Sequence, residues 1–293
     1  MSAITAFFFY IGVFIFGILP FPLLYVFSDV FRFFLHKVFR YRLSVVRENL
    51  SKAFPEMDRK NLRKLERDFY KNLSDIFLEG VKAFSMTKKQ IIRRHKIVNP
   101  EILSPYFNKG QDVLGVTGHL ANWEWGSLSA STQLDANIVA FYKKLNNKYI
   151  DGFVRRSRMK FGTTLASIEF TANTFEKHAG KKVVFLMAAD QNTIKRNLKI
   201  SRWISFFGRE VPFLHGPEKY ATQYNMPVVF IEIRRIRRGF YEINLYVIAE
   251  KPRTLPEGYL TRLYAERLEQ TIRNKPEDWL WSHKRWKFVG KNK

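Results

Sequence analysis

The residues best suited to chemistry lie in one short segment, Gly118-His-Leu-Ala-Asn-Trp-Glu-Trp125. His119 can act as a general base near neutral pH, and a carboxylate bonded to one imidazole nitrogen would fix its tautomer and stabilise the imidazolium. Glu124 is the candidate for that carboxylate. Positions i and i+5 lie about 140° apart on a continuous helix, so His119 must precede the helix in a turn. A histidine that merely caps a turn is the alternative.

No nucleophile of the protein's own accompanies this pair. The chain has no cysteine and no G-x-S-x-G segment, so the attacking group would be a hydroxyl or amine of the substrate. Position i+4 from the histidine is Trp123 and no H-E-x-x-H occurs, so we expect no metal site.

The elements that must position His119 alternate between apolar strands and amphipathic helices. Strands are predicted at residues 112–117, 137–141, 182–188, 227–233 and 240–248, and helices at 29–54, 58–84, 121–132, 146–160, 170–178, 215–225 and 257–274, with a short one from Pro276. The alternation predicts an α/β fold with a mixed sheet flanked by helices, since Arg237-Arg238-Gly239 marks a late hairpin. His119 then follows a buried strand, where ligands gather in such sheets.

The charge of the chain is strongly one-sided. Its 293 residues hold 50 Lys and Arg against 26 Asp and Glu, a formal net charge of +24. Such a charge favours a polyanionic neighbour, which could be nucleic acid, an anionic membrane or a phosphorylated or acidic substrate. No zinc-finger spacing or RNA-binding aromatic motif accompanies the charge, so we do not expect nucleic acid as a partner.

The N-terminal segment is the most apolar part of the chain. Residues 2–28 carry no charged side chain, and about 20 helical residues span a bilayer, so we predict an N-terminal membrane helix. Pro20 and Pro22 leave a kink or a re-entrant segment open, and a buried core helix is the alternative. Basic residues follow the segment, which predicts an anchor over 1–28 and a domain over 29–293 on the cytoplasmic side.

The His119 segment resembles the H-x4-[DE] box of the glycerolipid acyltransferases. In its G-H-x-x-N-W-E form it is similar to the late acyltransferases of lipid A biosynthesis, the lauroyl/myristoyl transferase family. Further blocks that resemble this family in order are Arg47–Leu50 with Ala53–Glu56, Phe141–Leu145, Val154–Arg158 with Phe161-Gly162, Ala189–Gln191, Phe206–Gly208 with His215–Pro217, and Pro276–Lys287. Two departures are Lys143-Lys144, where the family usually has Arg-Pro, and Asp278, where Gln is common.

The resemblance implies an acyltransferase at the inner membrane. The acyl group would pass from an acyl carrier protein (or coenzyme A) thioester, a co-substrate rather than a cofactor, to a hydroxyl of a phosphorylated glucosamine lipid. His119 would be the general base and Glu124 its orienting partner. The residues expected to bind substrate are Asn122, Lys143, Arg155, Arg156, Arg158, Asp190 and Gln191.

Purely structural roles also stay open for these residues. The arginines could form a solvated helix face, and Asp190 could cap a turn. Two other functions also stay open. One is an acyltransferase for another membrane lipid, such as a lysophospholipid or an amino-acid lipid. The other is a non-catalytic basic protein that binds a membrane or nucleic acid. The sequence leaves the acyl chain length and the acceptor undetermined.

Overall fold

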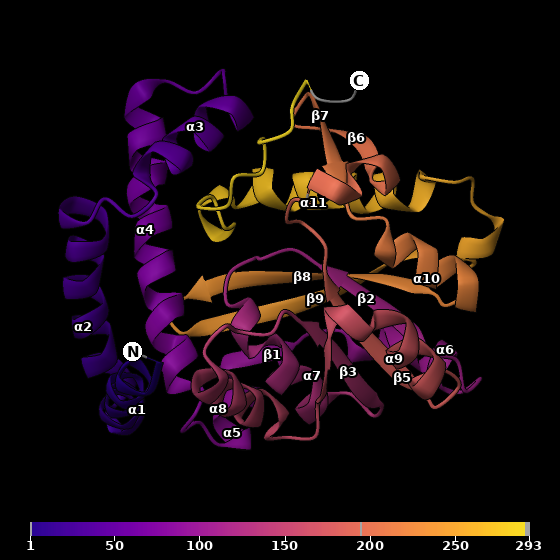
Figure 1. Ribbon diagram of the computed structural model, residues 1–293, viewed down its shortest axis with the longest axis horizontal. Coiled ribbons are helices and arrows are strands. Elements are labelled where there is room, and N and C mark those ends of the chain that lie inside the picture. The colour runs from indigo at the N-terminus through magenta and orange to yellow at the C-terminus, as the bar shows by residue number, and fades with distance from the viewer. Residues whose placement is uncertain (1, 194, 291–293) are drawn as a thin grey trace.

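The computed structural model describes residues 2–193 and 195–290, and a curled mixed sheet lies at its centre (Figure 1). Within these residues the sheet has seven strands in the order β1-β9-β8-β2-β5-β3-β4. Their bounds are β1 His95–Ile97, β2 Val113–Thr117, β3 Asn137–Tyr142, β4 Thr164–Ser167, β5 Val183–Ala188, β8 Val228–Arg237 and β9 Phe240–Ala249. Only β8 and β9 pair antiparallel among the sheet's neighbours, which confirms the predicted mixed sheet and its late hairpin.

Four short strands escaped the sequence prediction. The edge strands β1 and β4 have three and four residues, too few for a hydrophobic period to stand out. The other two, β6 Arg202–Phe206 and β7 Arg209–Phe213, form a separate antiparallel ribbon. Its turn is Phe207-Gly208, both with positive φ.

Helices cover both faces of the sheet and one end of it. Their bounds are α1 Ser2–Ile18, α2 Phe21–Phe33, α3 Leu43–Ala53, α4 Arg59–Lys82, α5 Lys88–Arg94, α6 Ser104–Phe107, α7 Gly126–Gln133, α8 Lys148–Met159, α9 Thr171–His178, α10 Gly216–Tyr224 and α11 Tyr259–Asn274. On one face Ala130 of α7 packs with Ile138 and Val184, and on the other Leu260 and Tyr264 of α11 lie beside Val116. The long helix α4 stands at the end of the sheet, with α2 against it (Figure 1).

The N-terminal segment is not the single membrane helix that we predicted. α1 ends before Pro20, because proline has no amide hydrogen and here holds an extended backbone with φ −60° and ψ 148°. α2 then starts at Phe21. Among the described residues no helix is both long enough and apolar enough to cross a bilayer.

The predicted helix over residues 29–54 is also divided. α2 continues to Phe33, a π-helical turn covers Phe34–Val38, and α3 starts only at Leu43. Arg40 and Arg42 take left-handed backbone conformations with φ of 50°, which ends helical propagation between the two helices. Residue 28 lies inside α2, so the predicted boundary at that residue falls within a helix. The two-part domain division stays a prediction.

The C-terminal tail closes the core. After α11, a 3-10 turn over Pro276–Asp278 leads into a segment whose three tryptophans, Trp279, Trp281 and Trp286, are all buried. They pack edge-on or stacked against one another and against Phe206 and Phe207 of the β6–β7 ribbon. The three tryptophans therefore serve packing between the tail and the ribbon.

Candidate active site

The turn that carries His119 lies at the carboxyl end of β2, in the middle of the sheet. Both neighbours of β2, the strands β5 and β8, run parallel to it, so the three carboxyl ends share one edge. Gly118 begins the turn. A Cβ atom there would lie 2.7 Å from Leu268 Cδ1 and 3.3 Å from Asp190 Oδ2, so only glycine lets the chain after β5 approach this closely.

Asp190 holds His119 at two points. Its Oδ2 accepts from the backbone N–H of His119 at 2.8 Å, and its Oδ1 lies 2.6 Å from imidazole Nδ1. The indole Nε1 of Trp279 donates to Oδ2 at 2.8 Å. Burial alone would raise the pKa of Asp190, but the charge and hydrogen bonds of His119, together with Trp279, lower it. The carboxylate is therefore ionised, fixed and aimed at the ring.

The other ring nitrogen points toward Gln191. The side-chain Nε2 of Gln191 lies 3.2 Å from His119 Nε2. Because Nδ1–H of the neutral ring donates to Asp190, Nε2 keeps its lone pair and accepts from the amide. Burial would lower the pKa of His119, yet the carboxylate of Asp190 outweighs it and raises the pKa above its ordinary value. The His119 side chain is 19% exposed, so the ring is not sealed inside the protein.

The structure corrects the role expected for Glu124. The carboxylate hydrogen-bonded to the imidazole is Asp190, whereas Glu124 forms an ion pair with Arg158 of α8, with Oε2 and Nη2 2.5 Å apart. Glu124 lies on the 3-10 turn Trp123–Trp125 and acts on His119 only through its charge, which favours the imidazolium. An i+5 residue at the start of a helix points away from the ring in this turn.

Asn122 supports the turn from inside the protein. It is fully buried, its Oδ1 accepts from the backbone N–H of Trp125 at 3.2 Å, and its Nδ2 donates to Glu79 Oε2 at 2.7 Å. Its neighbour Ala121 has a left-handed φ of 44°, and the N–H of Ala121 donates to the carbonyl of Asp278 at 2.6 Å. The structure thus places Asn122 in the scaffold of the turn rather than at its surface.

The remaining predicted residues divide into two groups. Arg158 and Gln191 join His119, Glu124 and Asp190 in one cluster. Lys143, Arg155 and Arg156 are exposed instead. The guanidinium of Arg155 lies 5.9 Å from the Tyr142 ring centre and that of Arg156 5.9 Å from the Phe153 ring centre. Of the three arginines, the structure therefore brings Arg158 to the motif.

Two residues of the site were missed in the sequence. Glu79 of α4 is fully buried and accepts hydrogen bonds from Tyr25, Tyr241 and Asn122. Burial raises its pKa to about 7. A glutamate inside the apolar half of a helix is the signal that could have found it. Trp279 is the second, because its indole N–H donates to Asp190 and the sequence analysis gave it no role at the site.

Fold and site together define an α/β protein with a histidine–aspartate pair at the carboxyl edge of its sheet. The aspartate hydrogen-bonds imidazole Nδ1, and the His119 side chain is partly exposed. Comparison with families identifies it further: the chain belongs to the bacterial lipid A biosynthesis acyltransferases, whose family model matches residues 1–288. This confirms the resemblance and supports an acyltransferase activity in lipid A biosynthesis. The comparison with curated proteins gives no match.

Proposed function

We propose that the protein transfers a fatty acyl group from an acyl carrier protein thioester to a hydroxyl of a phosphorylated glucosamine lipid, a lipid A precursor. The observation that carries this proposal is the His119–Asp190 pair at the edge of the sheet, in a chain of this family. In this arrangement the base has no nucleophile of the protein's own beside it in the sequence, so the acceptor hydroxyl attacks.

The reaction needs one proton to travel through His119. Nε2 takes the proton from the acceptor hydroxyl while its oxygen bonds to the thioester carbonyl carbon. The tetrahedral intermediate then collapses, the C–S bond breaks, and the imidazolium returns the proton to the leaving thiolate. The products are an ester and a free thiol. Asp190 stabilises the imidazolium between the two steps, and general-base help of this kind is worth about 10²–10⁴-fold.

Two neighbours of the base take positioning roles in this proposal. The amide of Gln191 leaves Nε2 when the acceptor hydroxyl arrives, and its N–H can then donate to the developing oxyanion. Arg158 is already neutralised by Glu124, so the pair fixes α8 against the motif. The exposed cations Lys143, Arg155 and Arg156 are better suited to acceptor phosphate.

Charge supports the proposed partners. Acyl carrier proteins are acidic and the acceptor is anionic, and both are attracted to a chain of net charge +24. Because the proposed acceptor is embedded in lipid, the proposal includes that the enzyme works at the inner membrane, on its cytoplasmic side. The acyl thioester serves as co-substrate, and the step above needs no metal or cofactor.

The test is acyl transfer by the purified full chain in detergent micelles. The acceptor is a phosphorylated glucosamine disaccharide lipid, and the donor an acyl carrier protein thioester or, in parallel, a coenzyme A thioester. His119→Ala should lose about 10²–10⁴-fold in kcat, and the matched control His178→Ala, on α9, should keep the wild-type rate. Equal rates for wild type and His119→Ala would overturn the catalytic assignment. Transfer only to a lysophospholipid or an amino-acid lipid would establish the alternative acceptor class.

A further inference from the structure

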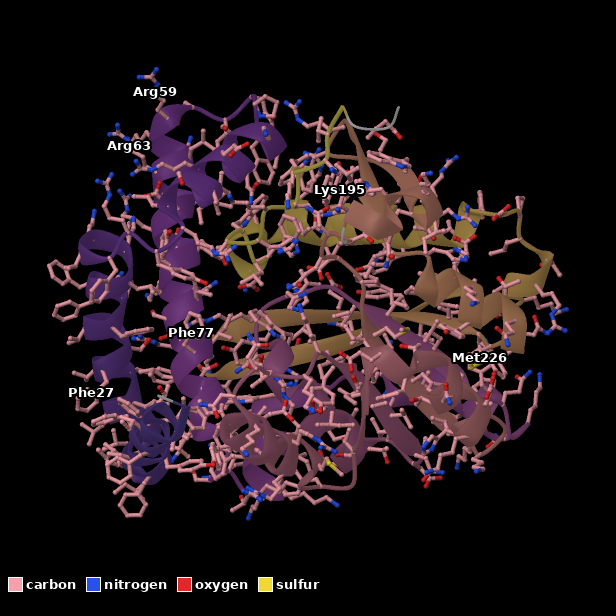
Figure 2. All side chains as sticks on the ribbon, in the orientation of Figure 1. Phe27, Arg59, Arg63, Phe77, Lys195 and Met226 are labelled. Atoms are coloured by element: carbon pink, nitrogen blue, oxygen red, sulfur yellow. The ribbon has the colours of Figure 1, made fainter. Side chains whose placement is uncertain are left out.

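The largest apolar surface of the molecule lies on its N-terminal helices. We call it the N-terminal face: the exposed apolar side chains of α1, α2 and the turn to Phe39. Its most exposed members are Ile4, Phe7, Phe8, Phe14, Ile18 and Phe39, each more than half exposed. Phe27 projects outward from it (Figure 2). No charged residue interrupts it before Asp29. Water-soluble monomers rarely leave such a continuous apolar surface without a partner.

The opposite side of these helices is fixed to the domain by polar contacts. In α1, the carbonyl of Gly17 accepts from Lys82 Nζ at 2.5 Å and from Ser85 Oγ at 2.6 Å. In α2, Ser28 Oγ donates to Asp75 Oδ1 at 2.5 Å. These contacts hold both helices along α4, with only their outer sides exposed.

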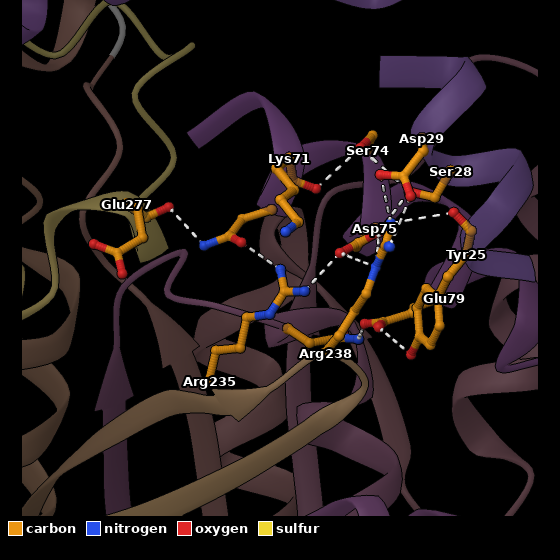
Figure 3. Close-up of polar contacts among 12 residues, drawn as sticks. Tyr25, Ser28, Asp29, Lys71, Ser74, Asp75, Glu79, Arg235, Arg238 and Glu277 are labelled. Atoms are coloured by element: carbon orange, nitrogen blue, oxygen red, sulfur yellow. Dashed lines mark hydrogen bonds and ion pairs between the residues drawn. The ribbon is translucent and has the colours of Figure 1, made fainter. Parts of the chain in front are cut away.

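A partly buried ionic cluster adds to this attachment (Figure 3). Arg238, at the β8–β9 hairpin, pairs with Asp29 of α2 at 2.9 Å and with Asp75 of α4 at 2.7 Å. Tyr25 donates to Glu79 at 2.8 Å in the same cluster. To cross a bilayer, α2 would have to leave these partners, and separating buried ion pairs is costly.

We propose that the N-terminal face seats the protein on one leaflet of an anionic phospholipid bilayer, with α1 and α2 lying in the plane of the interface. Charge complementarity selects this occupant. The exposed cations Lys37, Arg40 and Arg42 border the apolar side chains, and Arg59 and Arg63 project beyond α2 at the far end of α4 (Figure 2). An apolar face with a basic border is typical of interfacial helices. A second copy of a +24 chain would be repelled.

The helix α1 also contacts the helix that reaches the candidate active site. Tyr10 of α1 donates to the carbonyl of Tyr149 at 3.0 Å, and Phe9 meets Phe153 edge-on at 5.9 Å. Both partners belong to α8, the helix whose Arg158 binds Glu124 of the motif. A lipid held in the leaflet beside α1 therefore lies next to the elements that form the site. The inference deepens the proposed function and rests on it for the lipid nature of the acceptor.

Vesicle binding by the full chain tests the occupant, without any acyl transfer. The probes are vesicles of phosphatidylglycerol mixed with phosphatidylcholine, and of phosphatidylcholine alone. The double variant Phe8→Ser/Phe14→Ser should bind the anionic vesicles about tenfold more weakly or worse. The matched control Phe170→Ser removes an equally exposed phenylalanine outside the face and should bind within about twofold of wild type. Lys37→Glu/Arg40→Glu should lose affinity for anionic vesicles only. Equal binding by wild type and the Phe8/Phe14 variant would overturn the proposal.

The orientation of α1 and α2 on the bilayer is tested with single cysteines. Each label is then confined to the chosen position, because the chain has no cysteine of its own. Ala3→Cys, Ile18→Cys and Arg40→Cys carry an environment-sensitive fluorophore on protein bound from outside to sealed vesicles. In-plane helices place the first two labels at the same shallow depth, and an impermeant quencher reaches all three. A label at position 3 protected inside the vesicle, or a label at 18 quenched from the bilayer centre, would show a crossing or re-entrant segment and contradict the proposal.

The two proposals fail separately. One case is that the Phe8/Phe14 variant binds vesicles as wild type does, while the wild-type protein transfers acyl groups in micelles. The docking inference then fails and the proposed function stands. If vesicle binding behaves as expected but no thioester donor is used in micelles, the proposed function fails and the docking surface stands.

Discussion

Two carboxylates, Asp190 and Asp75, are bound by several donors each, but they belong to very different regions. Asp190 receives the backbone and imidazole of His119 and the indole of Trp279. Asp75 is fully buried and receives Ser28, Arg235 and Arg238. The partner of Asp190 is a partly exposed imidazole, which can gain and lose a proton, whereas the guanidiniums around Asp75 stay charged at every accessible pH. The first region can therefore move a proton, and the second can only hold elements together.

The comparison shows that similar polar networks differ through the chemistry of the group that the carboxylate binds. In the candidate active site that group is the partly exposed imidazole of His119, whose Nε2 takes the acceptor proton in the proposed function. In the Asp75 cluster the carboxylate faces its permanent partners, so it clamps α2, α4 and the β8–β9 hairpin together (Figure 3). Changes in the two regions should accordingly separate catalysis from stability.

The largest expected effect is on catalysis, from Asp190→Asn. The amide cannot balance the imidazolium charge and no longer fixes the required tautomer, so kcat should fall by about 10³–10⁴-fold. The free energy of unfolding should change far less than the activity, because the side chain keeps its size. Steady-state acyl transfer and thermal unfolding on the same sample measure both. A rate close to wild type would mean that Asp190 does not orient the base.

Asp75→Asn should act in the opposite way. It leaves Arg235 buried and Arg238 partly buried with less compensating charge, and breaking a buried pair costs about 3–5 kcal/mol of unfolding free energy. Denaturant titration in detergent measures this loss, and kcat per folded molecule should stay near wild type at low temperature. A large loss of kcat without a loss of stability would end the distinction between the two regions.

Much of this architecture could be predicted from the sequence, because the signals are local. The five longer strands of the sheet, the hairpin at Gly239 and the place of His119 after a buried strand all depend on short apolar runs and on turn residues. The partner of His119 depends on pairing between distant segments. Asp190 lies 71 residues further on and reaches the ring only through the parallel register of Thr117 with Ala188. Glu124, five positions after His119, was the nearer candidate in sequence, but its carboxylate pairs with Arg158 of α8.

The N-terminal helices show what composition alone does not predict. Composition alone predicted a membrane-spanning helix, and hydropathy carries no information on which side chains will meet the segment. Lys82 and Asp75 of α4, and Ser85 just after it, bind α1 and α2 from more than 40 residues away in sequence. The break at Pro20 was foreseeable from proline geometry, but the packing that follows it was not.

A smaller effect is expected from Glu124→Gln. The exposed ion pair with Arg158 is worth little stability, and kcat should fall about tenfold or less. The pH profile sharpens the comparison. Activity rises with pH as His119 loses its proton, and the carboxylates of Asp190 and Glu124 raise that pKa. Removing the charge of Glu124 should therefore lower the pKa of His119 and move the acid limb of the pH profile of kcat to lower pH. An unchanged limb with a large loss of kcat would restore Glu124 as a direct partner of the base.

The smallest effect concerns the pH dependence of stability through Glu79. Burial raises the pKa of Glu79 to about 7, so the folded state binds this proton more tightly than the unfolded state, whose value is near 4.5. The contribution is therefore fully present below about pH 4.5 and is lost as pH rises through about 7. Glu79→Gln, which keeps the shape and can still bond Tyr25, Tyr241 and Asn122, should remove this slope, on the order of 2 kcal/mol or less. Denaturant titrations at several pH values measure it, and parallel curves for the two proteins would contradict the assignment.

The bond from Ala121 N–H to the carbonyl of Asp278, and that from Trp279 to Asp190, set an order of events during synthesis. Every strand of the sheet, His119 and Asp190 leave the ribosome before residues 276–286, yet these late residues complete the turn and hold the aspartate. A nascent chain can therefore fold its sheet while its base still lacks the final support. The chain would therefore become competent for catalysis only when residues 276–286 have folded into place. A chain truncated before these residues would carry the whole motif and still be a poor enzyme.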